Sequence, residues 1–253
     1  MINPMMSSPI LITGVGKRLG FSLAQRLLNE GYSVIGTYRT ERQELEELRA
    51  SGADLYQVDF YQAGALEHFL DNVITDYTSI RAIVHNASDW LPDSNLPDKK
   101  LPDSKVTEEL SSAEIMNRMM TIHAAVPYQI NLALKELLGC HEPSSDIIHI
   151  SDYVAEKGSK KHIAYAASKA ALNNLTLSFS ALLAPKVKVN TISPALIKFN
   201  EQDTDQYKEK AVQKALIQSE AGFDEIIDGV LFILSSHYMT GRNLNLDGGR
   251  HLK

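Results

Sequence analysis

The sequence predicts an α/β fold: one domain over 1–253, with a doubly wound parallel sheet of about seven strands and helices on both faces. Short apolar runs alternate with longer amphipathic segments along the whole chain, which is the pattern of βαβ units. Runs such as 80–84 are almost continuously apolar, as expected for parallel strands buried on both faces. No repeat and no low-complexity linker interrupts this alternation, so we expect one domain.

The first half of the chain contains three strand–helix units. Short apolar runs predict the strands, and longer segments with charged residues predict the helices. In chain order these are a strand at 9–13, a helix at 19–29, a strand at 32–38, a short charged helix at 43–50, a strand at 55–58 and a helix at 65–77.

The second half begins with a strand at 80–85 and a loop at 89–105 that is rich in Pro, Asp, Lys and Ser. Ser111 and Glu114 have the spacing of a capping box, which predicts the start of one helix running to about Leu138. The remaining elements are strands at 146–151, 187–192 and 243–246 and helices at 164–183 and 223–235.

Composition excludes several classes of protein. The net charge is −6 and no basic run is longer than Lys160-Lys161, so we expect no nucleic-acid partner. No apolar stretch approaches the roughly 18 residues that span a bilayer, and residues 1–9 do not resemble a signal peptide. The single cysteine, Cys140, has no disulfide partner and no metal-ligand spacing around it, and we expect it to be at least half-buried. We therefore predict a cytoplasmic protein that neither crosses a membrane nor binds a metal ion.

A glycine-rich turn follows the first predicted strand, Thr13-Gly14-Val15-Gly16-Lys17-Arg18-Leu19-Gly20. Glycines there let backbone N–H groups approach a pyrophosphate at a helix N-terminus, although such glycines can also be purely structural. The second strand ends at Arg39, where NAD-binding proteins usually have Asp or Glu; an arginine accommodates a 2′-phosphate instead. Unless Arg39 is only a solvated charge, the cofactor is NADPH.

Tyr165 and Lys169 are four residues apart, so both project from one face of the predicted helix. A lysine ammonium beside a tyrosine hydroxyl favours the phenolate and is expected to lower the tyrosine pKa. Asp152 lies thirteen residues before Tyr165, and to act as an acid near neutral pH it needs a pKa raised by desolvation. The alternative for Asp152 is a carboxylate that caps a loop.

Four motifs in order resemble the short-chain dehydrogenase/reductase family, whose fold is of the Rossmann type. They are Thr13 to Gly20, Asn86-Ala87-Ser88, Tyr165 to Lys169, and 189–194 with the closing Asp247-Gly248-Gly249. Arg18, Ser88 and Asp152 depart from the usual family residues and are similar to those of the pteridine reductases within it. That resemblance implies NADPH-dependent reduction of a 7,8-dihydropterin, with hydride to C6 and a proton to N5, and weak reduction of dihydrofolate.

The resemblance also implies roles for individual residues. Asp152 and Tyr165 would deliver the proton, and Lys169 would bind the nicotinamide ribose. The cofactor-binding set is Gly14, Gly16, Lys17, Arg18, Leu19, Gly20, Arg39, Thr40, Asp59, Phe60, Asn86, Ala87, Ser88, Tyr165, Lys169 and Pro194. The substrate-binding set is Arg18, Ser88, Trp90, Asp152, Tyr153 and Tyr165.

His123 stands four residues before Pro127, where the family has a catalytic asparagine. The family asparagine organises a water that connects the lysine to solvent, and an imidazole nitrogen can do the same. A structural histidine is the equal alternative.

Trp90, the only tryptophan, follows Asn86-Ala87-Ser88 and is predicted to stack on the flat pterin ring; the alternative is an aromatic packed on the surface. Tyr153 is a weaker candidate for the pocket wall, and the segment 200–216 is predicted to cover the substrate. Family resemblance implies a homotetramer packed through 113–138 and 164–183.

Two competing functions remain open. One is an NADPH-dependent reductase of another carbonyl or imine, and the other is a non-catalytic NADP-binding sensor. Asp152 and Trp90 argue against the first, while Tyr165 and Lys169 argue against the second.

Overall fold

The seven strands form a single parallel sheet in a computed structural model that describes residues 8–93 and 110–253. Their order is β3-β2-β1-β4-β5-β6-β7, and every neighbouring pair is parallel. The strands are β1 (Ile10–Thr13), β2 (Val34–Tyr38), β3 (Asp54–Gln57), β4 (Ala82–His85), β5 (Ser145–Ile150), β6 (Val187–Pro194) and β7 (Asn243–Leu246). The order reverses between β1 and β4, which opens a crevice at their carboxyl ends.

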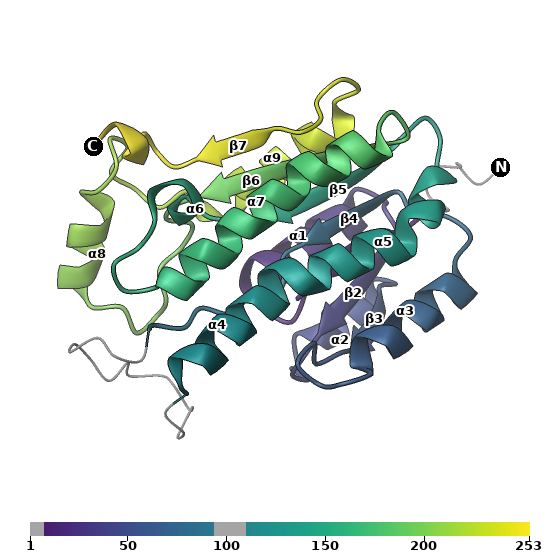
Figure 1. The fold of residues 1–253 in the computed structure, drawn as a ribbon, viewed down its shortest axis with the longest axis horizontal. Helices are drawn as coiled ribbons and strands as arrows, with labels where there is room; N and C mark the ends of the chain where they lie inside the picture. The colour runs from purple at the N-terminus through teal and green to yellow at the C-terminus, as the bar shows by residue number, and fades with distance from the viewer. Residues whose placement is uncertain (1–7, 94–109) are drawn as a thin grey trace.

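Helices cover both faces of the sheet, as predicted (Figure 1). Buried side chains of α1 (Arg18–Asn29), α2 (Leu45–Ala50) and α9 (Gly222–Ser235) pack on one face. Those of α3 (Ala65–Asp76), α5 (Val126–Gly139) and α7 (Ile163–Leu183) pack on the other. The two cores contain mainly the apolar residues whose periodicity predicted these elements.

The predicted helix ending near Leu138 is interrupted, which corrects the expectation of one continuous helix. The capping box is present: Ser111 Oγ accepts from the Glu114 N–H, and Glu114 Oε2 accepts from the Ser111 N–H at 2.7 Å. α4 (Ser112–Met120) then gives way to a π turn over Thr121–Ala125 before α5 starts. Pro127 has no backbone N–H and cannot donate a helical hydrogen bond in any case. A wider π turn before it therefore loses one hydrogen bond fewer than it would in front of another residue.

Two short helices were not predicted, α6 (Val154–Lys157) and α8 (Asp205–Val212). Neither has a buried residue, so neither has the apolar stripe by which helices are recognised in sequence. α8 lies within the segment 200–216. The predicted loop 89–105 is described only as far as Asp93, and 94–105 fall outside the described residues.

Cys140, the residue that ends α5, is exposed, so the expectation of a buried or half-buried cysteine is wrong. Within residues 8–93 and 110–253, no helix is long and apolar enough to cross a membrane.

Candidate active site

A cavity of about 390 Å³ opens at the carboxyl ends of β1, β2, β4, β5 and β6. It is lined by the complete set of residues predicted from the sequence to bind the cofactor, together with Asp152. Residues at the ends of separate strands meet here because all strands of a parallel sheet end at one edge. Tyr61, Asp89, Ile122, Ile150, Ala195 and Ile197 also line it and were not predicted.

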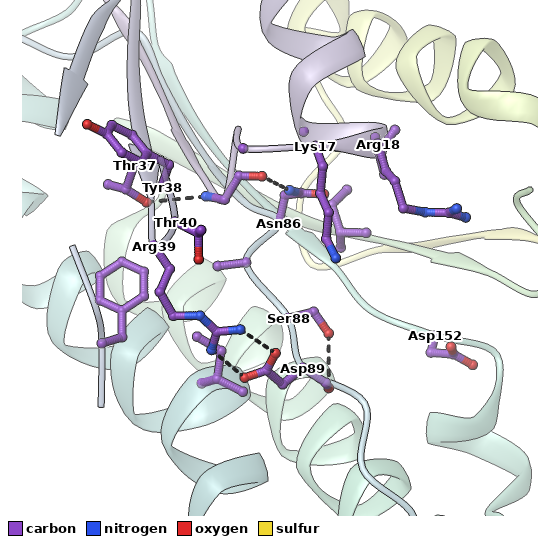
Figure 2. A pocket seen from close by; sticks show the side chains of 18 of the residues that line it. Lys17, Arg18, Thr37, Tyr38, Arg39, Thr40, Asn86, Ser88, Asp89 and Asp152 are labelled. Atoms are coloured by element: carbon purple, nitrogen blue, oxygen red, sulfur yellow. Dashed lines mark hydrogen bonds and ion pairs between the residues drawn. The ribbon is translucent and has the colours of Figure 1, made fainter. Parts of the chain in front are cut away.

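The glycine-rich turn is held against the end of β4. A Cβ on Gly14 would lie 2.9 Å from Ala87 Cα, and one on Gly20 would lie 2.1 Å from the Gly14 carbonyl oxygen. The Asn86 amide donates to the carbonyls of Thr13 and Gly14 at 3.1 and 3.0 Å, across the switch point of the sheet (Figure 2). These two glycines are therefore required for packing, in addition to any role with a ligand.

The same turn leaves room for a phosphate. A Cβ on Gly16 would meet nothing closer than 3.6 Å, so packing within the protein does not require a glycine at this position. The space beside Gly16 is open to a ligand. Lys17 at the start of α1 makes no side-chain cap, which leaves the first N–H groups of this 12-residue helix available to an anion. These observations fit the pyrophosphate of a dinucleotide.

Arg18 has φ +54°, in the left-handed region that favours glycine, and the cost of this conformation is about 1–2 kcal/mol. Its guanidinium turns away from Lys17 and donates to the Lys198 carbonyl at 2.5 Å and to Asn200 Oδ1 at 2.9 Å (Figure 2). Arg18 therefore ties the turn to the start of the segment 200–216. Within the described part of the chain, its hydrogen bonds go to this segment and not to the other residues predicted to bind the substrate.

Arg39 is paired with an acidic residue that the sequence did not indicate. Its guanidinium donates to both carboxylate oxygens of Asp89, at 2.9 and 3.3 Å (Figure 2). Tyr61 Oη donates to the same carboxylate at 2.9 Å. The Arg39 side chain is still half exposed at the cavity. A 2′-phosphate that binds Arg39 would therefore compete with Asp89 for the guanidinium.

Tyr165, Lys169 and Asp152 meet where α7 packs beside the end of β5. Tyr165 Oη donates to Asp152 Oδ2 at 3.0 Å, and Asp152 Oδ1 accepts from the Val154 N–H at 2.8 Å. The Lys169 ammonium donates to the Ile150 carbonyl at 2.9 Å and lies 5.6 Å from the centre of the Tyr165 ring. Asp152 thus both caps a turn, which was its alternative role, and contacts the tyrosine hydroxyl.

The electrostatics of this group confirm one expectation and contradict another. Burial raises the pKa of the Asp152 carboxyl, as an acid near neutral pH requires. Burial and the adjacent Asp152 carboxylate raise the pKa of Tyr165 well above its ordinary value, so the predicted lowering by Lys169 is wrong. Burial also lowers the pKa of Lys169 to about 8, which weakens the cation that was expected to favour the phenolate.

His123 lies in the π turn with both ring nitrogens engaged by protein groups. Its Nε2 is 2.7 Å from Ser88 Oγ and its Nδ1 is 2.8 Å from Ser168 Oγ, and its ring packs edge-on against Tyr165. Burial, and then the nearby Lys169, lower the pKa of His123 well below its ordinary value. No ring nitrogen is left for a water, so the geometry does not support the predicted water relay through this residue.

Trp90 and Tyr153 do not line the cavity. Trp90 stacks on His162, with ring centroids 3.9 Å apart, and is 53% exposed. The Tyr153 ring faces the Arg250 guanidinium at 5.0 Å. Trp90 therefore packs at the start of α7. It directly follows the cavity-lining residue Asp89 in the sequence, but its own side chain is not part of the cavity wall.

The segment 200–216 contributes to a second cavity of about 390 Å³. Ala211, Val212 and Ala215 line it together with the C-terminal turn at 245–250. Ala195 lines both cavities, so the second cavity adjoins the active-site cavity, whose wall contains no residue of the segment 200–216.

Comparison with known proteins agrees with this geometry. A family model described as enoyl-(acyl carrier protein) reductase matches residues 14–251. Proteins named dihydromonapterin reductase from Escherichia coli O6:H1 and Klebsiella pneumoniae are each 46% identical, over 98% and 97% of both chains respectively. A crystal structure titled FolM alternative dihydrofolate reductase 1 from Brucella suis, in complex with NADP, has a TM-score of 0.82 and 24% identity, covering 98% of this chain and 97% of that one. The chain belongs to the short-chain dehydrogenase/reductase family.

Proposed function

We propose that this protein uses NADPH to reduce 7,8-dihydromonapterin to 5,6,7,8-tetrahydromonapterin, with weak activity on dihydrofolate. The observation that carries the proposal is the hydrogen bond between Asp152 and Tyr165 in the wall of the cavity that contains the predicted cofactor-binding residues. The 46% identity to proteins named dihydromonapterin reductase, over nearly the whole chain, supports the same substrate.

The chain's residues supply the proton route for this reaction. NADPH, when bound, supplies the hydride for C6 of the pterin, and one proton is needed at N5. The buried Asp152 holds a proton to higher pH than an ordinary carboxyl, and Tyr165 Oη lies in direct contact with it. Asp152 and Tyr165 together deliver that proton, directly or through a water, while Lys169 and Tyr165 hold the nicotinamide ribose.

Residues at the other end of the cavity would hold the adenine half of the cofactor. The N-terminus of α1 with Gly16 and Lys17 would bind the pyrophosphate, and Arg39 with Thr40 would bind the 2′-phosphate. Without cofactor, Arg39 is paired with Asp89. When NADPH binds, the guanidinium exchanges the Asp89 carboxylate for the 2′-phosphate.

Replacing Arg39 tests the choice of cofactor. We expect Arg39→Ala to raise KM for NADPH by about 10- to 100-fold, because it removes a hydrogen-bonded charge from the 2′-phosphate. KM for NADH, which lacks that phosphate, should change little. Steady-state kinetics with both cofactors measure the difference, and Arg49→Ala, which breaks ion pairs to Glu41 and Glu46, is the matched control. Equal losses with NADPH and NADH would contradict the assignment.

Replacing Trp90 tests its proposed stacking on the pterin. The exposure of its ring supports this role, because the exposed face is open to a ligand. If the free face of the indole contacts the pterin, Trp90→Ala should raise KM for the dihydropterin about tenfold with kcat nearly unchanged. Tyr238→Ala removes another exposed aromatic side chain, in the turn before β7, and serves as control. An unchanged KM would show that Trp90 only packs on His162.

The direct test is NADPH oxidation with 7,8-dihydromonapterin, 7,8-dihydrobiopterin and 7,8-dihydrofolate in parallel. We expect the highest kcat/KM with 7,8-dihydromonapterin and a low but measurable rate with dihydrofolate. Turnover only of simple ketones or imines would favour the first competing function. NADPH binding without turnover of any substrate would favour a sensor. Either result would overturn the proposal.

The homotetramer and the cytoplasmic location remain part of the proposal. Exposed apolar side chains on α4 and α7 support self-association, among them Met116, Met120, Ile163, Leu177 and Leu182.

A further inference from the structure

The hydrogen bonds around His123 determine where its ring proton lies. Ser168 Oγ donates its only proton to the Tyr165 carbonyl at 2.7 Å, because a carbonyl oxygen can only accept. The contact between Ser168 Oγ and His123 Nδ1, at 2.8 Å, therefore needs its proton from the ring. His123 must carry a proton on Nδ1.

The other ring nitrogen is then an acceptor. His123 is 1% exposed, and the Asp152 carboxylate contacts Tyr165 rather than the imidazole. Among residues 8–93 and 110–253 no carboxylate pairs with the ring. With Lys169 nearby the buried ring stays neutral, so Nε2 keeps its lone pair. Ser88 Oγ, 2.7 Å away, donates its hydroxyl proton to Nε2. This contact is much shorter than the alternative one from Ser88 Oγ to the Asp89 carbonyl, at 3.4 Å.

Committing the Ser88 proton to His123 changes what Ser88 can do on its cavity side. Ser88 also lines the cavity. Without a free proton, its hydroxyl can only accept a hydrogen bond there. A ligand group that reaches Ser88 must therefore carry a donor, such as an N–H.

We propose that His123 is a positioning residue: its neutral, Nδ1-protonated ring takes the Ser88 proton and so fixes the Ser88 hydroxyl as a hydrogen-bond acceptor toward the cavity. Ser168 sets the tautomer, and the π turn at Thr121–Ala125 places the imidazole between the two serines. This inference rests on the proposed binding of a dihydropterin in the cavity, and it replaces the water relay expected of His123.

The tautomer can be measured without any substrate. In protein labelled with ¹⁵N-histidine, we expect the His123 ring to show a protonated Nδ1 and an unprotonated Nε2, assigned by the signals missing in His123→Asn. Ser168→Ala removes the acceptor that sets the tautomer and should shift the ring toward Nε2–H or tautomer exchange. Wild-type protein with protonated Nε2, or with both nitrogens protonated, would overturn the proposal. If dihydropterins are not turned over but the tautomer is as expected, only the proposed function fails.

Kinetics test whether His123 acts through Ser88. We expect His123→Ala to lower kcat/KM for the dihydropterin about tenfold with KM for NADPH unchanged, and His123→Asn, whose amide oxygen can accept from Ser88, to recover part of the loss. In a double-mutant cycle, Ser88→Ala with His123→Ala should be no slower than Ser88→Ala alone. Additive losses would overturn the proposal.

A control separates this effect from the loss of any buried histidine. His141, buried after α5 and close to Arg81, lies at the opposite edge of the sheet, so His141→Asn should leave kcat unchanged. If His123→Ala does not fold, the cycle uses His123→Asn, whose amide oxygen can accept only part of what Nε2 accepts from Ser88, and the tautomer of the wild-type ring is decisive by itself.

Discussion

Tyr165→Phe is expected to lower kcat for dihydropterin reduction by about 10²- to 10⁴-fold, the usual loss when a general acid is removed. The change deletes only the hydroxyl that contacts Asp152 Oδ2 at 3.0 Å, while the ring keeps its packing against His123 and near Lys169. Burial keeps the pKa of Tyr165 high, so the wild-type hydroxyl is a proton donor throughout the neutral range. The loss should therefore be in kcat and only weakly in KM.

Single-turnover rates with NADPH measure this loss, and cofactor binding followed by nucleotide fluorescence should change by less than the rate. Tyr128→Phe removes a hydroxyl from a tyrosine on α5 that packs against Phe179, and it should be fully active. A Tyr165→Phe enzyme with a near wild-type kcat would show that Asp152 or a water delivers the proton without the phenol.

Asp152→Asn should produce the second large effect, a loss of about 100-fold in kcat, because asparagine keeps the shape of the side chain but cannot supply a proton. The wild-type rate should decline toward alkaline pH in two steps. One follows loss of the Asp152 proton, whose pKa is raised by burial, and one follows loss of the Lys169 proton, whose pKa is about 8. In Asp152→Asn only the Lys169 step should remain, moved to lower pH because the Asp152 charge raises the pKa of Lys169. Two surviving steps would contradict the role of Asp152.

The same substitution should make the protein more stable at neutral pH. A folded-state pKa above the unfolded one means that the folded protein holds the Asp152 proton more tightly. Its contribution to stability is therefore present below the unfolded pKa, about 3.9, and is lost as pH rises through the folded value. Thermal unfolding of Asp152→Asn should give a Tm above wild type at pH 7 and a smaller difference near pH 4. A lower Tm at pH 7 would show that the pairing of Asp152 outweighs its burial.

Most elements could be predicted from the sequence because their signals are local. Buried strands such as β1 and β4 contain continuous apolar runs, and the helices that cover them have apolar stripes. The exceptions had no such signal. α8 buries no side chain, and the π turn at Thr121–Ala125 lies within a stretch whose apolar pattern continues on both sides.

The residues of the site were predictable by type and spacing, since turns that follow consecutive parallel strands converge at one edge of the sheet. Tyr165 and Lys169 share a helix face four residues apart, so their proximity is a property of the helix alone. The glycines of the first turn and Arg39 at the end of β2 are likewise local features, and all of them line the cavity.

Their partners and their protonation were decided by the tertiary structure. Asp89 meets Arg39 across 50 residues of chain, and His123 meets Ser88 and Ser168 across 35 and 45. Sequence alone placed a cation beside the tyrosine and predicted a lowered pKa. Packing instead desolvated Tyr165 and put a carboxylate against it, which raised its pKa. The physical reason is that residue type and spacing determine which groups reach the site, whereas burial and contacts between distant segments determine which of them hold protons.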